Sequence, residues 1–350
     1  MSTQQQNSLL PYFPDTAAVF SVFAIQRWAV FLDSGYPYSD QGRYDIFAAD
    51  PVVTFVTQGD ETLIQRNGSL IHSTDNPFNL LKQELVGKFS ERIADLPFNG
   101  GAMGYFSYDL ARRLEKLPLI AEDAENIPEM AVGIYDWAVL GDHNNQTSRL
   151  VGRGRNDKHW QSLIDLFSTP RTIKKTSRFR INGEIQSNMD KTGYAHAFDK
   201  IKHYLKEGDC YQVNLSQRFV ANCEGDPWEA YQVLREMNAA PFSAYMNLPD
   251  VQILSSSPER FLKLENGCVE TKPIKGTRPR RAYPASDWHQ IDQLRYSPKD
   301  RSENLMIVDL LRNDLSKVCK TGSVKVPSLF AIESYATVHH LVSTVTGLLR

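Results

Sequence analysis

The sequence predicts an α+β fold with largely antiparallel sheets, and two kinds of pattern carry that prediction. Short apolar runs separated by turn residues indicate strands, several of them joined as hairpins. Longer runs with apolar residues three or four positions apart indicate helices. Strands come both before and after these helices, which favours antiparallel sheets. With 350 residues, the chain can bury roughly three quarters of its unfolded surface, so its length permits one large domain or two.

The composition is that of an ordinary globular protein. A formal net charge of −2 gives no general attraction toward nucleic acids or an anionic membrane. No apolar run is long enough to cross a bilayer, and the first residues lack the basic segment and apolar core of a signal peptide. The four cysteines are far apart and form no C-x-x-C pair, which argues against a zinc site or a disulfide framework. We therefore expect a cytoplasmic protein that binds neither membranes nor nucleic acids.

The first half of the chain is expected to consist mainly of strands. Apolar runs bounded by turn residues predict strands at 28–32, 43–47, 52–56 and 131–140. Helical spacing of apolar residues predicts a helix over 77–89. The glycine-rich segment 98–106 lacks the ending of a phosphate loop, so its glycines are expected to allow close packing of strands. Asn144-Asn145 predicts a hairpin turn into 149–152.

The segment 153–188 is polar and basic with weak periodicity. It is the best candidate for a boundary between an N-terminal region, 1–152, and a second region, 185–350. The second region begins with a predicted helix over 188–208, since Gly208 supplies a C-terminal stop. Alternating and apolar runs predict strands at 211–219, 243–248 and 251–255. A further helix is expected from Ser297, a good N-cap followed by proline, to about Leu315.

The stretch 256–277 carries the candidate chemistry. Asn266-Gly267 lies between two runs typical of strands, and it predicts a tight hairpin because both turn positions need positive φ. The hairpin would bring Glu259 close to Lys275. A proton donor beside an amine suits covalent or acid-assisted catalysis. From the spacing alone, a surface salt bridge at the base of the hairpin is the more common outcome for such a pair.

Three other groups of residues have two interpretations each. Asp300 and Glu303 are one helical turn apart, so they could hold Mg²⁺ together, or Asp300 could cap the helix while Glu303 is solvated. His339 and His340 would face opposite sides of a strand, which suggests that one is buried and the other faces a cleft. A basic run could contact nucleic acid, but its prolines and the lack of an aromatic platform favour a small dicarboxylate. Its members are Lys272, Lys275, Arg278, Arg280 and Arg281.

The segments Ser257–Arg260 (SPER) and Pro273–Thr277 (PIKGT) resemble motifs of the chorismate-utilising enzymes, and the resemblance extends over about residues 34–343. It implies two large, mostly antiparallel sheets packed as a sandwich with helices outside. It also implies that residues 1–152 form an N-terminal region with a tryptophan pocket, and that 185–350 form the chorismate-binding catalytic region. Family members continue beyond the position of Arg350, so we expect this chain to be C-terminally incomplete and to have negligible synthase activity alone.

The resemblance also implies roles for single residues. Lys275 is the expected nucleophile that attacks C2 of chorismate, and Glu259 is the general acid that helps the C4 hydroxyl leave. Glu303, in the segment Lys299–Asn304 (KDRSEN), is a carboxylate ligand of Mg²⁺. The expected substrate contacts are Gly276, Thr277 and His340. The expected tryptophan contacts are Ser34, Arg43 and Tyr44 on one wall of the pocket and Pro241, Phe242 and Ser243 on the other.

Two positions discriminate within the family. Isochorismate and salicylate synthases carry a lysine where this chain has Gln212, and anthranilate synthases lack the amine at position 275. The resemblance therefore implies the aminodeoxychorismate branch, which forms 4-amino-4-deoxychorismate on the route to 4-aminobenzoate and folate. The chain has no visible cysteine nucleophile motif of an amidotransferase, so ammonia is expected from a glutamine amidotransferase partner. The alternatives are an anthranilate synthase component and an inactive module that binds tryptophan or the amidotransferase.

Overall fold

The computed structural model describes residues 5–38, 42–86, 96–120, 122–168 and 178–350. The chain divides into two compact units, each described separately below. The first unit comprises Met1–Ile173 and Tyr231–Arg350, and the second comprises Lys174–Ala230. This division differs from the expected regions 1–152 and 185–350, which stay a prediction about where the family's two regions lie. No helix among the described residues is long and apolar enough to span a membrane.

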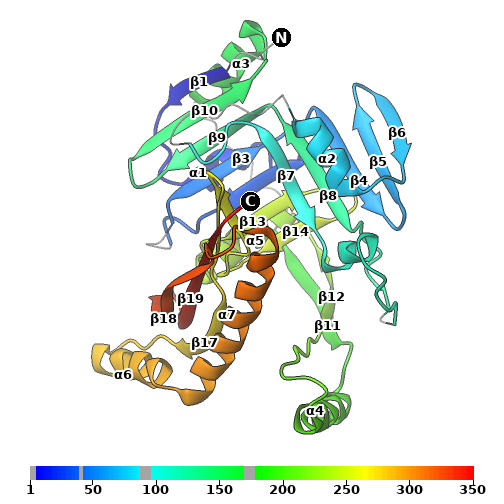
Figure 1. The fold of residues 1–350 in the computed structure, drawn as a ribbon. Helices are drawn as coiled ribbons and strands as arrows, with labels where there is room; N and C mark the ends of the chain where they lie inside the picture. Colours follow the sequence, from blue (N-terminus) through cyan, green and yellow to red (C-terminus); the bar gives the residue numbers. More distant parts are fainter. Residues whose placement is uncertain (1–4, 39–41, 87–95, 121, 169–177) are drawn as a thin grey trace. The chain divides into compact units, whose positions relative to one another are not determined.

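The largest sheet of the first unit has seven strands, drawn from distant parts of the chain (Figure 1). Their order is β1 (Gln5–Leu10), β10 (Thr147–Arg153), β9 (Trp137–Asp142), β3 (Tyr44–Ala48), β2 (Ala29–Asp33), β13 (Ser243–Asn247) and β14 (Gln252–Ser255). All neighbouring strands are antiparallel. The strands predicted at 28–32, 43–47, 243–248 and 251–255 are confirmed, as is the hairpin of β9 and β10.

A second sheet of the first unit has five antiparallel strands. Their order is β6 (Ser69–Ser73), β5 (Glu61–Arg66), β4 (Val53–Gln58), β8 (Met130–Tyr135) and β7 (Gly101–Phe106). The glycines of β7 do allow close packing: a Cβ on Gly104 would lie 2.1 Å from the carbonyl oxygen of Ala131. The helix predicted over 77–89 is α2 (Pro77–Leu85), and residues 87–89 lie outside the described part of the chain.

The prediction of one strand over 131–140 is wrong. The chain leaves β8 at Tyr135 and enters β9 at Trp137, and these strands belong to different sheets. Between them, the carboxylate of Asp136 accepts a hydrogen bond of 2.9 Å from Arg155. Both strands are buried along almost their whole length, so the apolar run continues through the break and gives no sign of it.

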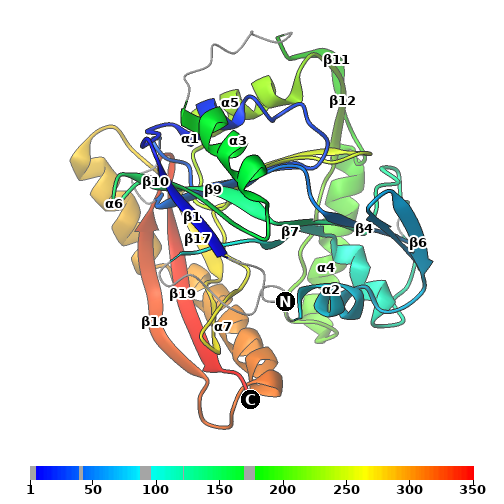
Figure 2. The same cartoon turned by 90° about the horizontal axis from the view of Figure 1, so that it is seen from above.

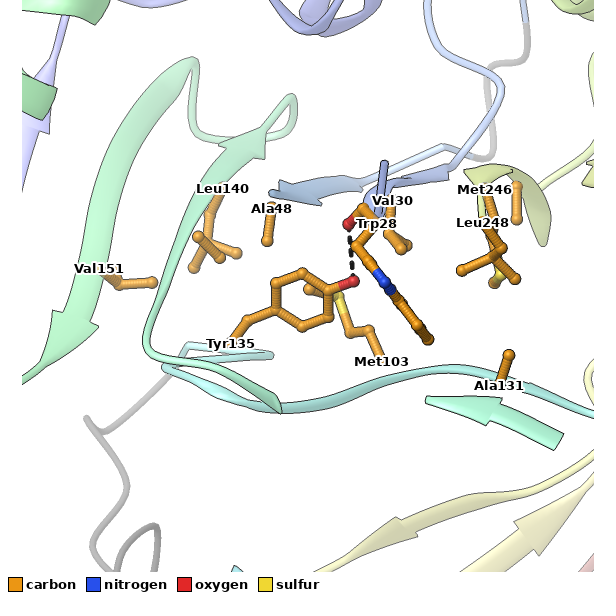
Figure 3. Packing of buried hydrophobic residues seen from close by; sticks show 12 residues of the cluster. Trp28, Val30, Ala48, Met103, Ala131, Tyr135, Leu140, Val151, Met246 and Leu248 are labelled. Atoms are coloured by element: carbon orange, nitrogen blue, oxygen red, sulfur yellow. Dashed lines mark hydrogen bonds between the residues drawn. The ribbon is translucent and has the colours of Figure 1, made fainter. Parts of the chain in front are cut away.

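These two sheets share one core, in which their inner faces meet (Figure 3). Val30, Leu140 and Met246 come from the seven-stranded sheet, while Met103 and Tyr135 come from the five-stranded sheet. The Tyr135 hydroxyl donates a hydrogen bond of 2.7 Å to the carbonyl of Trp28, which satisfies the polar atom of a fully buried ring. The sandwich of antiparallel sheets expected from the sequence is therefore present.

A third sheet carries the predicted hairpin. Its strands are β15 (Lys263–Glu265), β16 (Cys268–Thr271), β19 (Val338–Leu348) and β17 (Ile274–Pro279), with β18 (Lys325–Ser334) also paired to β19. Asn266 and Gly267 form the turn with φ of 50° and 74°, as a two-residue hairpin requires. Between β17 and β18 the chain forms two helices, α6 (Pro284–Arg295) and α7 (Pro298–Val318). The predicted N-cap Ser297 accepts a hydrogen bond of 3.2 Å from the amide of Asp300.

The remaining helices of the first unit are α1 (Thr16–Phe20), α3 (Asp157–Ser168) and the 3₁₀ helix η1 (Tyr108–Arg113). Helix α5 (Pro227–Met237) contains the boundary between the units. The second unit consists of β11 (Arg180–Ser187) paired with β12 (Phe219–Glu224), and α4 (Lys191–Glu207). Helix α4 confirms the prediction over 188–208, with Gly208 at φ 84°.

The strand predicted at 211–219 is wrong, since residues 212–218 have no regular structure. Their alternating sequence fits a strand, but a strand forms only where another pairs with it. Within the described residues, no strand pairs with this segment.

Candidate active site

The centre of the candidate site is β17, which carries Lys275, Gly276 and Thr277 and pairs with β19. The register shifts between Ile274 and Thr277, and Gly276 there has φ of 87°. A Cβ at Gly276 would lie 2.8 Å from the Cβ of Asp300, which is closer than side chains normally approach. Such bulges change the direction of neighbouring side chains next to active sites. The strand therefore requires glycine next to the candidate nucleophile.

Glu259 reaches this strand through its side chain. Its Oε1 accepts a hydrogen bond of 3.0 Å from the backbone N–H of Ile274, the residue before Lys275. Its own N–H donates to the Ser257 hydroxyl at 3.3 Å. Glu259 remains exposed, and it makes no ion pair with Lys275 within the described residues. The hairpin thus brings the acid to the strand of the amine, and the simple surface salt bridge between them does not form.

The basic run around β17 is largely neutralised by carboxylates. Three of its cations have partners: Lys272 pairs with Glu333, Arg278 with Asp300 at 2.8 Å, and Arg280 with Asp287 at 3.0 Å. Lys275 is half-buried and has no hydrogen-bond or ion-pair partner in the described part of the chain. Its amine is therefore available for a ligand, whereas three of the five cations of the run serve internal contacts.

His340 lies opposite Thr277 in the pairing of β19 with β17. Its Nδ1 and the Thr277 hydroxyl are 2.9 Å apart. Burial lowers the pKa of His340 below its ordinary value, although the negative charges of Glu259 and Glu333 act in the opposite direction. The imidazole of His340 and the hydroxyl of Thr277 thus lie on the same two paired strands as Lys275.

The neighbouring His339 faces the other side of the strand, as predicted. Its Nδ1 lies 2.8 Å from the Ser334 hydroxyl, and its Nε2 lies 2.9 Å from Asp287. The expectation that only one of the two histidines is buried is wrong, because His339 is 1% exposed and His340 is 8% exposed. Side chains on both faces of β19 cover them, which a sequence pattern of one strand does not reveal.

The expected metal ligand Glu303 lies in the second turn of α7. It is partly exposed, and one carboxylate oxygen is 3.8 Å from the Lys299 amine. Asp300, the other acid of the pair, is buried and bound to Arg278. No group of three histidine, cysteine or acidic side chains among the described residues is arranged to hold a metal ion. These residues therefore supply one partly exposed carboxylate, held only by a long ion pair with Lys299, and do not make up a whole magnesium site.

Of the expected tryptophan contacts, Tyr44 lies on β3 and Ser243 on β13, while Ser34 directly follows β2 and Arg43 directly precedes β3. Ser243 pairs with Asp33, the residue before Ser34, across β13 and β2. Arg43 pairs with Asp142 at 3.3 Å and lies over the Tyr44 ring.

Pro241 and Phe242 instead line a cavity of about 170 Å³ that extends toward the candidate active site. Its other walls include Arg260 and Ile274. The Arg260 guanidinium lies 5.1 Å from the centre of the Phe242 ring, and the Phe242 amide donates to the carbonyl of Ser257 at 3.1 Å. This segment therefore connects the sheet of Ser34 with the hairpin of Glu259.

Sequence reasoning missed a buried polar network around Ser34. Asp45 accepts hydrogen bonds from the Ser34 amide and hydroxyl at 2.9 and 2.7 Å, and its other oxygen lies 2.8 Å from His143. Asp33 accepts from Tyr231 at 2.9 Å and pairs with Arg235 at 2.8 Å. An acid inside an apolar run signals that a partner is needed. The sequence gives no means to identify partners that lie about a hundred or two hundred residues away.

Comparison with known proteins relates the motifs on β17, β19 and α7 to a family. Residues 32–350 match the family described as chorismate binding enzyme. The chain is 45% identical over 341 residues to aminodeoxychorismate synthase component 1 of Salmonella typhimurium, covering 97% of this chain and 74% of the relative. It is 32% identical to anthranilate synthase component 1 of Acetivibrio thermocellus, covering 98% of this chain and 71% of the relative.

The fold is likewise similar to a solved structure. The crystal structure of anthranilate synthase component I from Streptococcus pneumoniae matches with a TM-score of 0.76 and 26% sequence identity. The match covers 88% of this chain and 69% of that chain. The α+β architecture expected from the sequence motifs is thus confirmed.

Proposed function

The chain belongs to the chorismate binding enzyme family, and on that premise we propose that it is an aminodeoxychorismate synthase subunit. It would convert chorismate and ammonia into 4-amino-4-deoxychorismate, a precursor of 4-aminobenzoate and folate. The observation that carries the proposal is the amine of Lys275, which has no carboxylate partner within the described residues and follows the residue that binds Glu259. An anthranilate synthase does not need an amine at this position.

In the proposed reaction, the deprotonated Lys275 amine attacks C2 of chorismate. A C2–N bond forms, the ring double bond shifts, and the C4–O bond breaks. Glu259 donates the proton with which the C4 hydroxyl leaves as water. Ammonia then attacks C4, the double bond shifts back, and the lysine leaves C2 as a free amine. The sum is chorismate plus ammonia giving 4-amino-4-deoxychorismate plus water.

The neighbouring residues would hold the substrate. Thr277 and His340 provide a hydroxyl and an imidazole on the paired strands β17 and β19. Glu303 is proposed as one ligand of Mg²⁺, since this hard cation prefers carboxylate oxygens and the Glu303 side chain is 39% exposed. Its remaining ligands are not supplied by the described residues.

Two further components belong to the proposal. The ammonia would come from a separate glutamine amidotransferase subunit, in agreement with the name component 1 of the relative. Tryptophan would bind near Ser34, which directly follows β2, and Ser243, which opens the adjacent strand β13. We also place the protein in the cytoplasm.

The test is an assay of this chain and of a version extended with the C-terminal segment of a relative, with chorismate, an ammonium salt and Mg²⁺, supplemented with the amidotransferase subunit of a relative and glutamine. Liquid chromatography with mass detection would identify 4-amino-4-deoxychorismate. Anthranilate would be recognised by its fluorescence. It forms only when pyruvate is eliminated, so its presence would indicate an anthranilate synthase. Formation of anthranilate, or absence of both chorismate binding and turnover, would contradict the proposal.

A further inference from the structure

Two polar contacts fix helix α7 to strands β17 and β19, and we propose that Asp300 and Asn304 are the positioning residues that make them. They would hold the helix of Glu303 in a fixed place against the strand of Lys275. Figures 1 and 2 both show α7 running beside this sheet. The proposal rests on the proposed function, because it assigns Asp300 and Asn304 a role at that same site.

The first contact joins α7 to β17. Arg278 donates from Nη2 to Asp300 at 2.8 Å, and from Nη1 to the carbonyl of Thr277 at 2.8 Å. The guanidinium thus binds its own strand and the helix together. Asp300 is only 7% exposed, and its amide is held by Ser297. Removal of one member of such a pair leaves a poorly solvated charge, so the contact resists separation.

Steric contact reinforces this pair. Gly276 lies directly against the side chain of Asp300, so that even a Cβ on the glycine would meet Cβ of Asp300 at 2.8 Å and Cδ1 of Leu294 at 3.0 Å. The helix therefore has no free space to move toward β17. The ion pair prevents it from moving away, and together the two contacts define one separation between strand and helix.

The second contact joins α7 to β19. Asn304 is fully buried, and its amide donates to the carbonyl of Leu341 at 3.2 Å. Its side-chain oxygen accepts from the Ser343 hydroxyl at 2.5 Å. Leu341 directly follows His340, which contacts Thr277. The helix, β19 and β17 thus form a closed set of polar contacts around the proposed substrate-binding residues.

The segment 299–304 therefore has two functions on two faces of one helix. Asp300 and Asn304 are four residues apart and face the sheet, as residues at this spacing do. Glu303 lies off that face, with 39% of its side chain exposed. Asp300, which the sequence suggested as a second metal ligand or a simple cap, is thus bound to Arg278, while Glu303 is the more exposed of the two acids.

The experiment compares Asp300→Asn, Arg278→Met, Arg278→Lys and Asn304→Ala with Asp309→Asn in the full chain. Asp309 is an exposed control on the same helix, paired with Arg312. Hydrogen–deuterium exchange is measured over 274–279, and chorismate binding is measured by calorimetry. We expect exchange at least about tenfold faster and binding about tenfold to a hundredfold weaker for Asp300→Asn, Arg278→Met and Asn304→Ala. Arg278→Lys should retain much of the protection from exchange and much of the affinity for chorismate, and Asp309→Asn should match the parent in both measurements.

A merely structural role would lower the melting temperature but leave the chorismate dissociation constant of the folded fraction unchanged, and that result would overturn the proposal. Equal exchange rates and equal chorismate dissociation constants for Arg278→Lys and Arg278→Met would also overturn it. If Asp300→Asn does not fold, the Arg278 pair of variants decides. Failure of the parent chain to bind chorismate would refute the proposed function. The exchange data would still show whether the two contacts hold β17.

Discussion

At the scale of single residues, Lys275 differs from most of the basic run in having no carboxylate partner among the described residues. Lys272, Arg278 and Arg280 are each bound to a carboxylate, while Lys275 has none in the described part of the chain. In the version extended with the C-terminal segment of a relative, we expect Lys275→Ala to reduce amination at least about a hundredfold, the usual loss for a catalytic group. Lys263→Ala, which removes an exposed lysine of the hairpin, is the matched control. Peptide mass analysis with chorismate but no ammonia should show an adduct at Lys275, and a fully active alanine variant would refute the assignment.

A substitution of Glu259 tests its proposed role as the general acid. In Glu259→Gln, the amide oxygen can still accept the hydrogen bond from Ile274, so the local fold should be kept. The amide cannot donate the proton that the leaving hydroxyl needs. In the extended version of the chain we therefore expect turnover to fall about a hundredfold with little change in melting temperature, measured by product assay and calorimetry. Turnover at the parental rate would show that Glu259 is not the general acid.

His340 makes stability depend on pH. Its pKa is lowered in the folded state by burial, so the folded protein binds fewer protons than the unfolded chain when the pH falls below the ordinary histidine value of about 6.5. The contribution of His340 to stability should therefore be present above about pH 6.5 and be lost as the pH falls through the lower folded-state pKa. His340→Gln should flatten this part of the stability profile, measured by denaturant unfolding from pH 7.5 to 5. Replacement of the exposed His159 is the control, and equal profiles for both variants would contradict the prediction.

The residues of the candidate site could be named from the sequence, but their partners could not. Short motifs identified Glu259, Lys275 and His340 because those motifs lie in continuous segments. The pairing of Arg278 with Asp300 spans the whole of α6 and the start of α7, and an arginine beside several acids has no preferred partner in a linear sequence. Which acid stays free for a ligand is therefore a property of packing.

At the scale of elements, local sequence patterns predicted the tight hairpin and the helix caps. They could not predict which strands pair with each other. Asn266-Gly267 and Ser297 act within a few residues, so their effects can be derived from the sequence. The run 131–140 reads as one strand because the core of the sandwich buries both β8 and β9. The alternation at 211–219 satisfies the pattern of a strand without giving it a neighbour.

The bulge of β17 leads to a prediction about an element. Gly276→Ala combines a positive φ with a clash against Asp300, while Gly267→Ala has a positive φ with nothing within 4 Å. Both variants should lose about 1 to 3 kcal/mol of unfolding free energy from backbone strain. Gly276→Ala should lose about 1 to 3 kcal/mol more from overpacking, and it should also weaken chorismate binding. Denaturant unfolding and calorimetry would check this, and equal losses in the two variants would show that the contact with Asp300 relaxes without cost.

At the scale of the whole molecule, the seven-stranded sheet joins segments that the sequence separates. Strands β13 and β14 come from the later part of the chain and extend a sheet built mainly from the first 153 residues. The polar segment 153–188 suggested a boundary because composition is a local property. Long-range strand pairing crosses that boundary, so the proposed catalytic hairpin and the proposed tryptophan site share one framework through the segment at Pro241 and Phe242.

This shared framework gives the last prediction. Ser34 and Ser243 lie near each other because β2 pairs with β13, although they are distant in sequence. If tryptophan binds there, it should stabilise the folded chain by about 2.7 kcal/mol at a hundred times its dissociation constant, and so raise the melting temperature. Ser243→Ala removes a buried hydroxyl whose internal partner is the carbonyl of Ala240, and we expect it to reduce the thermal shift. Phe261→Ala, at an exposed position, is the control variant, and leucine is the control ligand. Because the site joins strands from both parts of the sheet, no thermal shift and no heat of binding at millimolar tryptophan would mean that the buried network around Asp45 is a structural feature of the sheet and holds no ligand.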